Sequence, residues 1–243
     1  MRFFIISLAF ALAACGGSAA PSPEGTYGAN PELAEPQSGG LPTINTADVS
    51  RWPEGAAPTA PEGFTVTRYA EELDHPRWLY VLPNGDVLVA ESSTEAQKDG
   101  GLMGWIRNMV QDSAGAIGES ANRVTLLRDA NKDGVVDERH VFAQNLNQPF
   151  GMLQVGGYVY IANTDAVLRW PYTEGATSVS GAGETVLQLP HREGDNGHWT
   201  RNLIASADGS KIYVSVGSAS NIGDHGMAAE EGRAAIWEMN PDG

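Results

Sequence analysis

An acidic loop in the middle of the chain has the composition of a cation site. It reads Asp129-Ala130-Asn131-Lys132-Asp133-Gly134-Val135-Val136-Asp137. Oxygen-bearing side chains stand at loop positions 1, 3, 5 and 9 and a glycine at position 6, which matches a calcium loop turning tightly around one ion. The candidate ligands are Asp129, Asn131, Asp133, Val135 (through its carbonyl) and Asp137. Position 12 is His140 in place of a bidentate Glu, and strands are expected on both sides, so a plain acidic hairpin turn is the alternative.

A second segment, His198-Trp199-Thr200-Arg201-Asn202, combines a titratable ring with a cation and an amide. The pKa of an imidazole suits proton transfer near neutral pH, and arginine pairs with carboxylates bidentately. A structural interpretation is also open: His198 would cap a strand end, and Arg201 and Asn202 would hydrogen-bond between sheets. The residue types alone do not choose between the two.

Three repeated segments indicate the elements that would position these residues. Each has a strand, a tight turn and a second strand rich in β-branched or aromatic residues, and the turns are Asn84-Gly85, Gly156-Gly157 and Asp208-Gly209. Such residue pairs favour two-residue hairpins, and a regular series of hairpins is typical of propeller blades. We therefore predict an all-β fold, a β-propeller of which this chain holds about three blades over residues 61–243.

The first repeat is longer than the second, so we expect an insertion over residues 92–122. Its apolar residues at helical spacing are Leu102, Trp105, Ile106, Met109 and Val110. This spacing predicts one short helix, packed against the propeller or serving as a lid. Residues 64–69 alternate with period two and predict a further half-buried strand.

The N-terminus has the features of an export signal. Arg2, a short apolar run and small residues before Cys15 predict a signal peptide over residues 1–14, because a membrane span would need about 20 apolar residues. Leu12-Ala13-Ala14-Cys15 resembles the bacterial lipobox, and Cys15 is the only cysteine. We predict lipidation of Cys15, a tether rich in Gly, Pro, Ser and Ala over residues 15–60, and a periplasmic location at the outer membrane, which Gly16 favours. An ordinary signal peptide is the alternative.

Charge and the C-terminus narrow the possible partners. Thirty Asp and Glu against fifteen Lys and Arg give a formal charge of −15, which argues against nucleic acid because its binding relies on basic side chains. The turn at residues 240–243 follows a strand-like segment, 234–239, with no returning strand. We therefore expect the chain to be the N-terminal part of a longer protein.

Several segments together resemble the glucose/sorbosone dehydrogenase family, across roughly Pro61 to Gly243. They are residues 73–92, 122–129, 146–152, 197–202 and 231–237, of which His-Trp-Thr-Arg-Asn and Glu-Gly-Arg-Ala are the more specific parts. Members of the family are six-bladed propellers that use pyrroloquinoline quinone (PQQ). The resemblance implies oxidation of a sugar or sugar-derived aldehyde, with electrons passed to a cytochrome or membrane quinone. A glutamine-containing loop of the family has no clear counterpart at residues 99–104.

The resemblance also implies roles for individual residues. His198 would be the general base, and the cofactor contacts would be Arg201, Asn202, Arg77, Phe150 and Arg233. Arg77 and Phe150 stand at equivalent positions of two repeats and should face one axis, where Trp78 and Trp199 would stack on a flat cofactor or belong to the core. A divalent cation, calcium, would polarise the quinone carbonyl, and an ion in the acidic loop would be separate and structural.

Two other functions fit a propeller of this kind. One is a non-catalytic lipoprotein that binds glycans or a protein through the same axial mouth, since propellers serve many functions. The other is a calcium-dependent lactonase, which would need a cluster of carboxylates that residues 198–202 do not offer.

Overall fold

The computed structural model describes residues 52–53, 55–96, 101–115, 117–192, 198–223 and 225–243. The predicted signal peptide, Cys15 and most of the predicted tether lie outside the described residues. Among the helices of the described segments, none has the length and apolar character that a membrane crossing requires.

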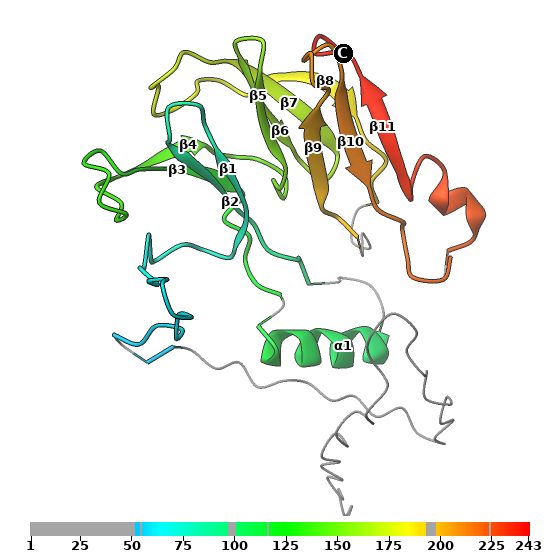
Figure 1. The fold of residues 1–243 in the computed structure, drawn as a ribbon. Coiled ribbons are helices and arrows are strands. Elements are labelled where there is room, and N and C mark those ends of the chain that lie inside the picture. Colours follow the sequence, from blue (N-terminus) through cyan, green and yellow to red (C-terminus); the bar gives the residue numbers. More distant parts are fainter. Residues whose placement is uncertain (1–51, 54, 97–100, 116, 193–197, 224) are drawn as a thin grey trace, which may run out of the picture. The chain divides into compact units, whose positions relative to one another are not determined.

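The described chain folds into three antiparallel sheets and one α-helix (Figure 1). The first sheet has the order β1 (Pro76–Val81), β2 (Val87–Glu91), β3 (Arg123–Arg128), β4 (Glu138–Ala143). The second has the order β5 (Met152–Val155), β6 (Tyr158–Ala162), β7 (Ala166–Pro171), β8 (Glu184–Gln188). The third consists of β9 (Arg201–Ala205), β10 (Ile212–Val216) and β11 (Ala235–Met239). Each sheet is a meander of sequential strands, the pattern of a propeller blade.

The glycine turns lie where the repeats place them, each joining the first two strands of its sheet. Gly85 has a φ of 94°, and Gly156 and Gly157 have φ angles of 60° and 78°. Side chains other than glycine rarely adopt these angles, and a two-residue turn with both φ positive matches the twist of the strands it connects. Val155 accordingly pairs with Tyr158 directly across the second turn. The predicted all-β propeller fold with about three blades is confirmed.

The core lies between successive sheets. One buried cluster joins residues of the first and second sheets, among them Leu88, Phe142 and Ile161. A second joins the second and third sheets, among them Tyr160 and Val214. Burial of large apolar side chains contributes about 1.5–3 kcal/mol each. The two clusters thus hold the first strands of neighbouring sheets, β1, β5 and β9, next to one another.

A buried carboxylate closes the end of β2. Glu91 has no exposed surface and accepts hydrogen bonds from the guanidinium of Arg123, the hydroxyl of Thr125 and the backbone N–H of Asp74. Burial raises the pKa of the Glu91 carboxyl, but these hydrogen bonds together outweigh burial and lower it below its usual value. Glu91 is therefore held ionised and paired inside the first sheet.

The strand predicted over residues 64–69 is wrong, and the helix predicted in the insertion is confirmed. Residues 64–69 form no strand, and Phe64 is 75% exposed, because alternation provides no partner strand and none pairs with this segment among the described residues. The predicted helix exists as α1 (Gly101–Ser113). Of its apolar side chains, Leu102 and Trp105 are 72% and 61% exposed, whereas Ile106 and Val110 are half-buried. Helical spacing puts apolar side chains on one face but does not supply a surface to cover them.

Candidate functional site

The N-terminal ends of β1, β5 and β9 bring an aromatic cluster together. The ring centroids of Trp78 and Phe150 are 5.3 Å apart, and those of Phe150 and Trp199 are 6.2 Å apart in an edge-on arrangement. The Cζ atom of Arg77 lies 5.8 Å from the Trp199 ring centroid. Arg77 and Phe150, predicted from the repeats to face one axis, therefore share one cluster with residues of the third sheet.

Hydrogen bonds hold together the segments that carry this cluster. The hydroxyl of Ser92 donates to the carbonyl of Pro149 (2.7 Å), and the indole N–H of Trp199 donates to the hydroxyl of Thr94 (3.0 Å). Nε of Arg77 donates to the carbonyl of Ser92 (2.8 Å). The segments entering β5 and β9 are thus tied to the segment leaving β2.

His198 lies in the turn before β9 and is exposed to solvent. Its Nδ1 lies 3.1 Å from the carbonyl oxygen and 3.0 Å from the hydroxyl oxygen of Ser218, its only hydrogen-bond partner within the described part of the chain. A carbonyl oxygen can only accept a hydrogen bond, so we assign the proton of the neutral ring to Nδ1. The lone pair is then on Nε2, the nitrogen that is free to take a proton from a ligand.

Gly217 explains how the end of β10 comes so close to His198. A Cβ atom on Gly217 would lie 2.7 Å from the Cβ of His198 and 3.2 Å from its carbonyl oxygen. Any side chain at this position would therefore displace the imidazole from Ser218.

Arg201 is fully buried and bonds to backbone oxygens. Its Nη1 donates to the carbonyls of His198 (2.7 Å) and Thr200 (3.1 Å), and its Nη2 donates to the carbonyl of Pro190 (3.1 Å), which follows the second sheet. Its Nε is without a partner among the described residues. Of the two interpretations from the sequence, this geometry corresponds to the hydrogen bond between sheets, and it also fixes the main chain of His198.

A second buried arginine lies near Arg201. Burial, followed by the charge of Arg233, lowers the pKa of Arg201 to about 10, and Asp165 opposes this. Arg233 is also buried, which lowers its pKa, while the carboxylate of Glu230 acts in the opposite direction. The two guanidinium groups place positive charge near the turn that carries His198.

Asn202 is half-buried and makes local contacts. Its side-chain oxygen accepts a hydrogen bond from the N–H of Leu203 (2.9 Å), and its own backbone N–H donates to the hydroxyl of Ser215 (3.0 Å). The residues predicted to contact the cofactor therefore fall into two groups. Arg77 and Phe150 lie in the aromatic cluster, whereas Arg201 and Asn202 belong to β9 and Arg233 precedes β11.

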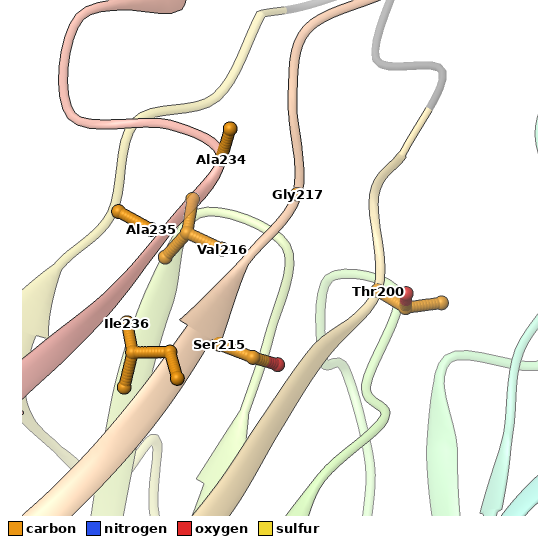
Figure 2. Close-up of a pocket in the computed structure, with 7 residues that line it drawn as sticks. All are labelled: Thr200, Ser215, Val216, Gly217, Ala234, Ala235 and Ile236. Carbon is orange, nitrogen blue, oxygen red and sulfur yellow. The ribbon is translucent and has the colours of Figure 1, made fainter. Parts of the chain in front are cut away.

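A groove of about 400 Å³ lies on the third sheet at the end where His198 is found. It is lined by Thr200, Ser215, Val216, Gly217, Ala234, Ala235 and Ile236 (Figure 2). Its polar side chains are the hydroxyls of Thr200, directly before β9, and Ser215, on β10 (Figure 2). The groove thus offers hydroxyl and apolar contacts and carries no charged side chain.

The acidic loop joins β3 to β4, and its carboxylates turn inward. Asp129 accepts a hydrogen bond from the N–H of Gly134 (2.8 Å), and Asn131 accepts one from the N–H of Asp133 (2.8 Å). Asp137 accepts one from the N–H of Asn131 (3.2 Å). The loop has the tight turn through Gly134, with a φ of 89°, that the spacing predicts.

A metal centre also requires several ligand groups to lie around one point. In the segments that the structure describes, no group of three or more His, Cys, Asp or Glu side chains is placed to hold a metal ion. Val135 uses its N–H to bond to Asp133 (2.9 Å) and is exposed. Calcium binding by this loop stays a prediction.

Two residues were missed by the sequence analysis: Ser218, which lies beside His198, and Glu230, which holds the loop after Ser218. Ser218 contacts the imidazole, and Glu230 accepts hydrogen bonds from the backbone N–H groups of Ala219 (2.7 Å) and Ser220 (3.2 Å). The hairpin repeat could have placed Ser218 near His198, because the start of β9 and the end of β10 must be neighbours in a hairpin. The pairing of Arg201 with Val216 confirms this.

The fold and this site define part of a β-propeller with a candidate site at one end of its innermost strands. The TrAA12-like family matches residues 58–241, and the chain belongs to this family. The narrower assignment to the sorbosone dehydrogenases stays a prediction. A comparison with curated proteins finds no match.

Solved structures resemble the chain in fold. The iodide and calcium structures of the Trichoderma reesei enzyme of carbohydrate-active enzyme family AA12 each have a TM-score of 0.54 at 19% identity, over 76% of this chain and 40% of theirs. The holo form of the pyranose dehydrogenase PQQ domain from Coprinopsis cinerea has a TM-score of 0.48 at 20% identity, over 70% of this chain and 34% of that chain. The chain thus spans less than half the length of these structures.

Proposed function

We propose that the protein is a PQQ-dependent oxidoreductase that oxidises a sugar or sugar-derived aldehyde, with His198 as the general base. The observation that carries the proposal is the imidazole of His198. It is exposed and oriented through Nδ1 by Ser218, and its residue directly precedes Trp199 of the aromatic cluster. Membership of the TrAA12-like family and the resemblance of the His198–Asn202 segment to sugar dehydrogenases support it.

The side chains at the cluster fit a flat, anionic cofactor. PQQ is planar and carries three carboxylates, so its site needs ring surfaces and cations. Trp78 and Phe150 are partly exposed. Arg77 is exposed, and its Nε donates to the carbonyl of Ser92. Arg77 would hold a carboxylate, and Trp78 and Phe150 would face the rings. Arg201 would act at longer range, through its charge, because its terminal nitrogens already bond to carbonyls.

The chemistry assigns one task to this chain's own residues. When bound, PQQ supplies a two-electron acceptor. Nε2 of His198 would accept the proton of the substrate hydroxyl (of the hydrate, for an aldehyde) while the hydrogen of the adjacent C–H bond leaves with its electron pair, as hydride, to that acceptor. The C–OH group then becomes C=O. The carbonyl of Ser218 would stabilise the imidazolium that results, since it accepts a hydrogen bond from Nδ1–H in both states. The electrons would then pass to a cytochrome or a membrane quinone.

The test uses the full-length protein reconstituted with PQQ and calcium in a dye-linked assay with aldoses and sugar aldehydes. His198→Ala should lower kcat by about 10²–10⁴-fold and leave PQQ affinity unchanged, because a base acts in the transition state. Arg77→Gln should instead raise the PQQ concentration needed for activity. If absorbance titration shows no PQQ binding to the wild type, the proposal fails and a glycan- or protein-binding propeller replaces it. If His198→Ala keeps full turnover, the assignment of the base is wrong.

We also propose that calcium binds at two places, at the cofactor and in the acidic loop. A further proposal is that a lipid on Cys15 holds the protein at the periplasmic face of the outer membrane. The oxygen-rich inward-facing loop from Asp129 to Asp137 supports calcium in that loop. The lipobox-like segment ending at Cys15 supports the lipid anchor.

A further inference from the structure

Glu230 is connected to His198 through one loop. Glu230 is the last residue of the 3₁₀ helix η1 (Met227–Glu230). Its carboxylate accepts hydrogen bonds from the backbone N–H groups of Ala219 (2.7 Å) and Ser220 (3.2 Å). The preceding residue, Ser218, presents its carbonyl and its hydroxyl to Nδ1 of His198. The loop after β10 is thus held by a carboxylate on one side and contacts the imidazole on the other.

The carboxylate is suited to anchor this loop at neutral pH. The hydrogen bonds from the backbone N–H groups lower the pKa of Glu230, and the one from Ala219 has the largest effect. Burial acts in the opposite direction. An ionised acceptor forms shorter and stronger hydrogen bonds than a neutral one. The two bonds go to consecutive residues, so they restrict the orientation of the peptide that carries the Ser218 carbonyl.

The imidazole needs such support because it is exposed. A neutral exposed histidine samples both tautomers and several ring orientations, and the hydrogen bond at one ring nitrogen sets the state of the other. The backbone of His198 is fixed separately, by Nη1 of Arg201. The side chain depends on Ser218 alone within the described residues.

We propose that Ser218 and Glu230 are positioning residues that keep His198 protonated at Nδ1 and open at Nε2. Glu230 orients the loop, the Ser218 carbonyl accepts the hydrogen bond from Nδ1–H, and the Ser218 hydroxyl provides a second acceptor. The inference rests on the proposed role of His198 in catalysis, but the tautomer itself can be observed without any cofactor or substrate.

The primary experiment is a long-range ¹H–¹⁵N spectrum of the histidine rings in ¹⁵N-labelled full-length protein, with His198→Ala used to assign the signals. Wild type should show His198 as the Nδ1–H tautomer. Glu230→Ala should give a mixture of tautomers, and Ser218→Ala a smaller shift in the same direction, because the carbonyl remains. Ser218→Thr keeps the hydroxyl and should restore the wild-type spectrum. Glu231→Ala, which removes the neighbouring exposed carboxylate, is the matched control and should leave the spectrum unchanged.

Kinetics provide the second measurement. Glu230→Ala should lower kcat by about 10²-fold, the effect of misplacing a catalytic group by about 1 Å, with KM within about twofold of wild type. Glu230→Gln retains one acceptor oxygen and should fall between Glu230→Ala and wild type in both measurements. It also replaces Glu230→Ala if circular dichroism shows that the alanine variant does not fold.

The outcomes separate the two proposals. An Nε2–H tautomer in the wild type, or Glu230 variants with an unchanged tautomer, would overturn the positioning inference whatever the enzyme does. A tautomer that shifts as expected in a protein with no PQQ-dependent activity would leave the positioning inference standing and refute the proposed function.

Discussion

The contact between the second and third sheets depends on Gly151, and replacing this glycine tests the geometry of the site frame. A Cβ atom at Gly151 would lie 2.6 Å from the Cα of Asn202, 2.8 Å from the carbonyl oxygen of Arg201 and 2.8 Å from the side-chain oxygen of Asn202. Two of these atoms belong to the backbone of β9, which cannot rotate away as a side chain can. The N–H of Gly151 also donates to the Arg201 carbonyl at 2.8 Å, so moving the strands apart weakens a buried hydrogen bond.

The expected cost of Gly151→Ala follows from these contacts. Overpacking a well-packed interior costs about 1–3 kcal/mol, and the two close contacts with the backbone of β9 place this variant near the upper end. For a fold of this size about 1 kcal/mol corresponds to about 2–4 °C in Tm. We therefore expect Gly151→Ala to lower Tm by about 6–12 °C in thermal denaturation followed by circular dichroism.

Gly118→Ala is the matched control. Its Cβ would come nearest, at 3.1 Å, to Nε2 of His75, the end of an exposed side chain that can move aside. Substitutions of this kind usually stay within about 0.5 kcal/mol of wild type, so its Tm should change by no more than about 2 °C. A Gly151→Ala protein that melts together with the Gly118→Ala control would refute the close approach of β9 to the segment before β5.

Three further predictions concern other parts of the chain. Because the folded pKa of Glu91 is lowered, its stabilisation is complete above its unfolded pKa of about 4.3 and is lost as pH falls through the folded pKa. Glu91→Gln should therefore be less stable than wild type at pH 7, and thermal melts should show the difference shrinking below about pH 4; a difference that stays constant with pH would contradict this. Calcium should raise Tm of the full-length protein by an amount that Asp129→Ala and Asp133→Ala abolish, and identical melting with calcium and with chelator would leave only the hairpin-turn interpretation. Cys15→Ser should move the protein from the membrane to the soluble fraction, and retention on membranes after a salt wash would exclude the lipid anchor.

Local sequence patterns determined the elements of this fold. Asn84-Gly85, Gly156-Gly157 and Asp208-Gly209 predict the three hairpins because a tight turn depends on the residues that form it and on the strands beside it. The register of each hairpin follows from its turn, so the meeting of Arg77 and Phe150 at one end of the inner strands is also implied by the repeat. The helical spacing of the insertion likewise predicted α1.

The partners of individual side chains were decided by the tertiary structure. The sequence left two roles open for Arg201, and the carbonyl of Pro190, across the sheet boundary, shows which groups its guanidinium contacts. Glu230 carries no motif that marks it, because its partners Ala219 and Ser220 are backbone amides, which every residue except proline possesses. Alternation at residues 64–69 predicted a strand, but a strand needs a partner at hydrogen-bond distance, which is a property of packing. Periodicity is local and can be read along the chain, whereas a hydrogen bond between groups distant in sequence exists only once the sheets are packed.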